Sequence, residues 1–118
     1  MATTSSRAIT IVYSGDTVGT EPLNAASNTA SPGAVQIIAL SSGANTITVP
    51  TAVGYAVTGC TIVPQAANVN ALTLKGISGD TGIFLHLTDP TSIGIDPVHS
   101  PTFVINAAAT TNIKVYWT

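Results

Sequence analysis

Ile113-Lys114-Val115-Tyr116-Trp117 carries the clearest structural signal in this chain, because its apolar side chains recur with a period of two. In an extended strand that period places Ile113, Val115 and Trp117 on one face. Leu72-Thr73-Leu74-Lys75 repeats the pattern, and in both segments the opposite face carries a lysine; these are the only two lysines in the chain. We therefore expect two strands, each with one buried face and one face in water.

The same period of two extends over most of the sequence, which is rich in Thr, Val, Ile and Gly rather than in strong helix formers. We expect strands over residues 8–13, 34–40, 46–50, 59–63, 71–77, 83–88, 92–95, 102–106 and 113–117. Clusters of Ser, Gly, Asn and Pro separate them and are typical of turns. This spacing predicts an all-β fold, a single-domain, jelly-roll-like β-sandwich of about eight short strands.

The length of 118 residues suits one domain that folds without metals or cross-links, so we expect a single domain over residues 1–118. Residues 1–6 and 16–33 are predicted to form an extended N-terminal arm and a long loop, because small polar residues there show little alternation. The single Cys60 excludes an internal disulfide framework. With no basic residue near it in sequence, Cys60 is interpreted as a small buried hydrophobic residue.

Charged residues make up only 7% of the chain, against 45% hydrophobic residues, and the formal net charge is −2. A soluble domain usually has about 25% charged residues. So few basic groups cannot neutralise a run of phosphates or an anionic bilayer, and we expect neither nucleic acid nor a membrane as a partner. The N-terminus lacks a signal-peptide core, which predicts synthesis in the cytoplasm. The composition favours a protein that is part of an assembly.

Asp80-Thr81-Gly82 matches the catalytic triplet of aspartic proteases, in which two such carboxylates share a proton and activate water. Those enzymes place apolar residues before the triplet and a small residue after it. Here Ser78-Gly79 precedes it and the bulky Ile83-Phe84-Leu85 follows. We therefore interpret the triplet as a turn between strands, in which Asp80 accepts hydrogen bonds from nearby backbone N–H groups.

Four potential ligands for zinc, manganese or non-haem iron follow with the spacing His-x2-Asp-x6-Asp-x2-His: His86, Asp89, Asp96 and His99. Strand alternation predicts that His86 lies on an outer face, opposite Ile83, Leu85 and Leu87. Both aspartates precede proline, as turn formers do. Whether these residues bind a metal stays open at this point, and no metal ligand, cofactor site or catalytic residue is assigned. The aromatic residues are expected in the core or in an interface.

The second half of the chain resembles small virion proteins of tailed bacteriophages, above all capsid decoration or cement proteins. The resemblance covers residues 60–118 and rests on Leu72-Thr73-Leu74-Lys75-Gly76-Ile77-Ser78-Gly79-Asp80-Thr81-Gly82-Ile83, Leu87-Thr88-Asp89-Pro90, residues 103–106 and Val115-Tyr116-Trp117-Thr118. It implies a β-sandwich on the exterior of an icosahedral capsid. It also implies a homotrimer that contacts the major capsid protein, bridges capsomers and is no enzyme.

Surfaces rich in Ser, Thr, Ala and Asn lose little solvation energy and side-chain entropy on burial, which independently favours association. Sheet edges without Lys or Glu are expected to be paired in an oligomer or covered by an arm. Three alternatives stay open. The chain is compatible with a head-fibre or tail-associated virion protein, with an adhesin or carbohydrate-binding module, and with a protease that depends on Asp80.

Overall fold

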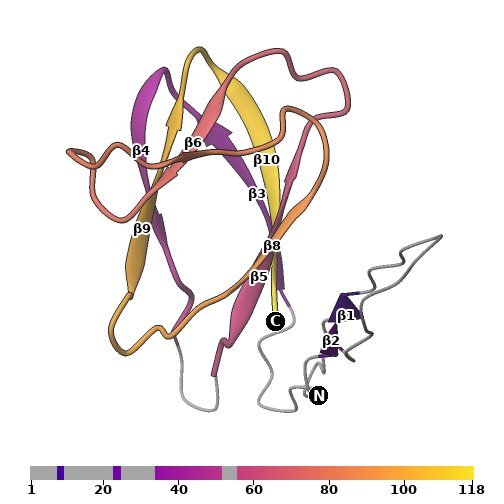
Figure 1. The fold of residues 1–118 in the computed structure, drawn as a ribbon, viewed down its shortest axis with the longest axis vertical. Coiled ribbons are helices and arrows are strands. Elements are labelled where there is room, and N and C mark those ends of the chain that lie inside the picture. Colours follow the sequence, from indigo (N-terminus) through magenta and orange to yellow (C-terminus); the bar gives the residue numbers. More distant parts are fainter. Residues whose placement is uncertain (1–7, 10–22, 25–33, 52–55) are drawn as a thin grey trace, which may run out of the picture.

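The computed structural model describes residues 8–9, 23–24, 34–51 and 56–118, and all regular structure in these ranges is β (Figure 1). The strands are β1 (Ala8–Ile9), β2 (Leu23–Asn24), β3 (Ala34–Leu40), β4 (Gly43–Thr48), β5 (Gly59–Pro64), β6 (Leu72–Lys75), β7 (Ile83–Phe84), β8 (Thr91–Gly94), β9 (Thr102–Ala107) and β10 (Thr111–Trp117). In this part of the chain there is no helix with the length and hydropathy that a membrane crossing requires.

Two four-stranded antiparallel sheets form the body of the molecule, with strand orders β3-β10-β5-β8 and β4-β9-β6-β7. β3 pairs with β10, β4 with β9, β5 with β8 and β6 with β7. The two halves of the chain from β3 onward therefore run against each other as one long antiparallel ribbon, rolled so that successive pairs fall in opposite sheets. This arrangement is the jelly roll. The predicted all-β sandwich is confirmed, and Figure 1 shows its two sheets.

β10 organises the first sheet, because it lies between β3 and β5 and pairs with both. Its residues alternate strictly between buried and exposed from Thr111 to Trp117. Ile113, Val115 and Trp117 are at most 1% exposed, whereas Lys114 and Tyr116 face outward. The alternation predicted from residues 113–117 is therefore confirmed.

The core fills the space between the sheets with side chains from both: Leu40, Ile47, Val49, Val57, Cys60, Ile62, Leu72, Phe103, Ile105, Ala107, Ile113, Val115 and Trp117. The rings of Trp117 and of Phe103 on the other sheet pack edge to face, with ring centroids 6.3 Å apart. Its indole Nε1–H donates to Oε1 of Gln36 at 2.9 Å. Cys60 is fully buried in this core, as expected for a small hydrophobic residue.

Several strand boundaries differ from the sequence prediction for local reasons. The strand expected at 46–50 begins earlier, as β4, although Val49 N–H still bonds to Pro101 O at 2.9 Å beyond its end. The strand expected at 83–88 is only β7, because the chain turns at His86. β2 lies inside the loop predicted at 16–33 and pairs with β1. Residues 1–6, 10–13 and the rest of 16–33 lie outside the described residues.

The face of β6 predicted to be wet is in fact covered. Thr73 is 6% exposed and Lys75 only half-exposed. The reason is the return of the chain at Gly82, where an added Cβ would lie 2.7 Å from both Thr73 Cγ2 and Lys75 Cγ. Two-sided burial of β6 was therefore not predictable from its own alternation.

Candidate interaction surface

On the outer face of the β3-β10-β5-β8 sheet, apolar side chains lie on both sides of one lysine. Val35 lies opposite Tyr116 in the register of β3 and β10, and Ile37 lies opposite Lys114. Ile37 is 71% exposed, Val35 56% and Tyr116 40%. On the other side of β10, Val63 of β5 lies opposite Lys114. We call the surface formed by Val35, Ile37, Val63, Lys114 and Tyr116 the outer face.

A groove hollows one end of the outer face. Its lining includes Ile37 on β3, Val63 on β5, Lys114 on β10 and the loop at 65–67. The lining is mainly aliphatic, and Lys114 is the only charged group in it. Such a surface is suited to binding by burial of apolar area and by pairing of one positive charge.

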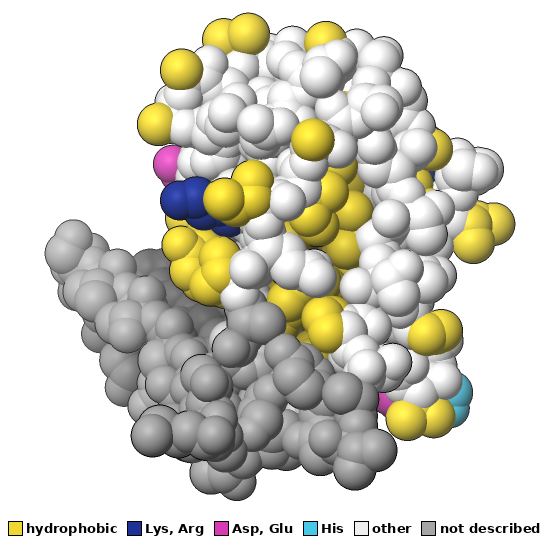
Figure 2. All heavy atoms as spheres, turned by 180° about the vertical axis from the view of Figure 1, so that it is seen from behind, with side chains coloured by type: hydrophobic (Ala, Val, Ile, Leu, Met, Phe, Trp, Pro, Cys, Tyr) yellow, Lys and Arg dark blue, Asp and Glu magenta, His cyan; other side chains and the backbone are white. Residues whose placement is uncertain are grey.

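Charged residues are few in the sequence, and Figure 2 shows one face of the molecule on which few charged side chains are visible and hydrophobic side chains gather. In the described ranges the acidic residues all occupy loops: Asp80 between β6 and β7, Asp89 between β7 and β8, and Asp96 between β8 and β9. No acidic residue lies on the outer face as defined above. Contact with another neutral surface therefore has a small desolvation cost.

Asp80-Thr81-Gly82 forms the turn that the sequence predicts. Asp80 Oδ2 accepts a hydrogen bond from Ile77 N–H at 3.0 Å, and Asp80 N–H donates to Ile77 O at 3.1 Å. Gly82 has a φ of +77°, a conformation that L side chains rarely adopt, and it lies against the β6 backbone at Leu74 O. The triplet thus has a structural role in returning the chain along β6.

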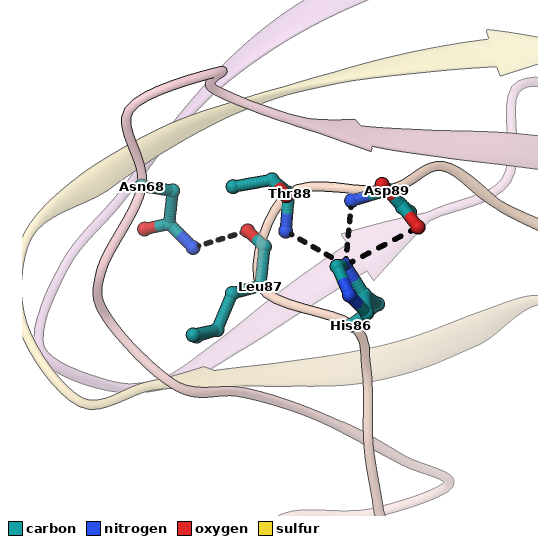
Figure 3. Close-up of polar contacts among 5 residues, drawn as sticks. All are labelled: Asn68, His86, Leu87, Thr88 and Asp89. Atoms are coloured by element: carbon teal, nitrogen blue, oxygen red, sulfur yellow. Dashed lines mark hydrogen bonds and ion pairs between the residues drawn. The ribbon is translucent and has the colours of Figure 1, made fainter.

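The four potential metal ligands fall into two separate His–Asp pairs, each inside one turn. His86 Nδ1 accepts from the backbone N–H groups of Thr88 at 3.2 Å and Asp89 at 2.8 Å (Figure 3). His99 Nδ1 lies 2.8 Å from Asp96 Oδ2. Among the residues that the structure describes, no three His, Cys, Asp or Glu side chains gather where they could hold one ion. His86 is exposed as predicted. The cause is its position in a turn, however, and not the alternation of a strand.

Asn68 is a buried polar residue that the sequence analysis did not single out. Its Nδ2 donates to Leu87 O at 2.7 Å (Figure 3) and to Asn70 O at 3.0 Å. Its Oδ1 accepts from Thr111 Oγ1 at 3.2 Å. One amide therefore links the β5–β6 loop, the β7–β8 loop and the first residue of β10. Nothing in the local pattern at 66–70 distinguishes this asparagine from an ordinary turn residue.

A second exposed apolar group lies at the opposite edge of the sandwich, on β7 and the turn before it. Ile77 is 66% exposed, Ile83 69% and Phe84 73%. Phe103 and Trp117 are in the core, as expected, whereas Phe84 and Tyr116 are exposed on different sheets. Tyr13 and Tyr55 lie outside the described residues.

The sequence matches no protein-family model, and comparisons with curated proteins and with solved structures likewise give no match. The jelly-roll assignment therefore rests on the strand order and pairing of this molecule. The resemblance to bacteriophage decoration proteins stays a prediction.

Proposed function

We propose that this protein is a structural, non-catalytic part of a tailed-bacteriophage virion. In this proposal it binds the outer surface of the capsid, as a homotrimer, and stabilises the capsid by bridging neighbouring capsomers. Its partners are other copies of itself and the major capsid protein.

The observation that carries the proposal is the outer face: exposed apolar side chains on β3 and β10 beside Lys114, its one charge, on a jelly-roll domain. Jelly rolls recur in viral capsid and lectin domains. Exposed apolar surfaces of this kind mark contacts with other proteins. Fold alone does not define function, so the surface and the composition are the stronger support.

Sedimentation with capsids tests the proposal. The purified chain is mixed with capsids, lacking this protein, of the virus that encodes it, and the capsids are pelleted. We expect saturable binding with a fixed number of copies per capsomer, and a higher temperature of capsid disruption. A chain that stays in the supernatant at every concentration, and is absent from purified virions, would contradict the proposal.

A pair of variants localises the binding. Tyr116→Lys puts a second positive charge on the outer face, and we expect it to weaken capsid binding at least tenfold. Val69→Lys is the matched control, because Val69 is 81% exposed and lies in the β5–β6 loop. Equal binding by both variants would show that another surface contacts the capsid.

Two alternatives predict different outcomes. A head-fibre or tail-associated protein would appear on the fibre or tail in immunogold images of virions, rather than on the capsid. An adhesin or carbohydrate-binding module is favoured by Phe84, whose ring is exposed beside Ile83 and offers an apolar face to a sugar ring. Glycan binding that is lost in Phe84→Ala would support that alternative.

A further inference from the structure

We propose that β3 pairs edge to edge with β3 of a second copy, about a two-fold axis through Ile37, so that two β3-β10-β5-β8 sheets become one continuous sheet. The inference goes beyond capsid binding and does not depend on it.

The first observation is that β3 lacks the features that normally prevent edge pairing. It is the terminal strand of its sheet, with β10 on one side and no described strand on the other. It is seven residues long, and its register with β10 is unbroken. The segment Ala34–Leu40 contains no charge, proline or glycine. Natural edge strands are usually short, charged, bulged or interrupted by proline.

The other sheet edges are less suited to pairing. β7 has only two residues, and β8 has four and ends at Gly94. β4 is longer, but the side chains it exposes are small or polar: Ala44, Thr46 and Thr48. On β3 the corresponding outward positions are Val35, Ile37 and Ala39, and the first two are large, apolar and more than half exposed. β3 is therefore the edge that gains most from a partner.

The second observation is that β3 is complementary to itself. An antiparallel pair centred on Ile37 uses all seven residues and sets Ile37 against Ile37 of the second copy, with Val35 against Ala39. Gln36 does not obstruct this pairing, because its Oε1 already accepts the Trp117 indole N–H. Cross-strand aliphatic pairs of this kind stabilise antiparallel sheets.

Charge also permits the two-fold contact. Among the described residues, the charged group paired with β3 is Lys114, which lies on β10 directly opposite Ile37. Three strand spacings would separate the two Lys114 residues, about 14 Å at the usual distance between strands. The Debye length at physiological salt is about 8 Å, so repulsion between them is largely screened. Because β3 itself contains no charge, a partner strand with acidic residues would find no charge on β3 to pair with.

The molar mass of the full chain in solution, measured by light scattering on a sizing column, tests the inference. We expect a dimer, or a hexamer if the proposed three-fold contact also forms. Ile37→Lys should halve that mass, because it places two ammonium groups in direct contact. Val98→Lys is the matched control and should keep the mass unchanged, since Val98 is 85% exposed in the β8–β9 loop.

A wild-type monomer or trimer, or an Ile37→Lys variant with the wild-type mass, would overturn the inference. Thermal unfolding of both lysine variants verifies that they are folded. Should Ile37→Lys not fold, Ile37→Cys replaces it: mild oxidation is expected to link two copies covalently, whereas Val98→Cys is not. Absence of that link in a folded Ile37→Cys protein would also overturn the pairing. Capsid binding is measured separately, so its failure is distinguishable from failure of this contact.

Discussion

At the scale of the residue, Gly82 combines two features that each disfavour a side chain: its backbone conformation and its close contact with β6. Its φ of +77° disfavours any L side chain, and an added Cβ would lie 2.6 Å from Leu74 O. We predict that Gly82→Ala lowers the free energy of unfolding by about 2 kcal/mol or more, from left-handed strain plus overpacking. Urea unfolding measures the change. Gly79→Ala is the control, because a Cβ there meets nothing within 4 Å and should cost less than about 0.5 kcal/mol.

Asn68 is the residue on which three loops and strands converge. Asn68→Ala removes the donor to Leu87 O and the acceptor for Thr111 Oγ1 at a residue that is only 6% exposed. We predict a loss of about 2–4 kcal/mol in the free energy of unfolding. The control is Asn112→Ala on the exposed side of β10, with an expected change below about 0.5 kcal/mol. Similar losses in both variants would show that Asn68 is an ordinary turn residue.

At the scale of the element, β10 is the strand whose two faces have different roles. It contributes three core side chains on its inner face, and on its outer face Lys114 and Tyr116 belong to the candidate interaction surface. The same strand therefore contributes both to the core and to the candidate interaction surface. Because a period of two separates the two roles, adjacent positions should respond very differently to the same substitution.

We predict that Val115→Asn lowers the free energy of unfolding by about 3–5 kcal/mol, from lost apolar burial and from burial of a polar amide. Tyr116→Asn, one residue further along β10, should cost less than about 1 kcal/mol, because Tyr116 is 40% exposed. Denaturant unfolding of the two variants under identical conditions provides the comparison. Equal losses would contradict the assignment of the two faces.

At the scale of the whole molecule, the sandwich and the segments before it are predicted to have separate roles. Residues 1–6 and 16–33 are hypothesised to be contact arms, and apart from β2 they lie outside the described residues. Deleting both segments should abolish capsid sedimentation while the protein still unfolds cooperatively, because the core residues identified in the described ranges lie between Leu40 and Trp117. Retained sedimentation would refute the role of the arms.

Local alternation was sufficient to predict the fold class and most strands, because burial on one face of a strand imposes a period of two on adjacent residues. Ala34–Leu40 and the inward face of β10 were predicted in this way. The turn at Asp80 followed from its flanking residues. Thr73 was not predicted correctly, since its burial depends on Gly82 from the returning chain. The contacts of Asn68 were not predicted for a similar reason, because they join residues far apart in the sequence.

The sequence by itself determined that this protein is all-β, nearly uncharged and organised as one sandwich, because composition and periodicity are properties of neighbouring residues. Only the tertiary structure decided that the four potential ligands form two separate pairs and that β3 is a terminal strand of its sheet. Which strand is central and which is an edge depends on pairing between segments far apart in sequence, such as β3 with β10. No local pattern records that pairing, and the exposure of Val35 and Ile37 follows from it.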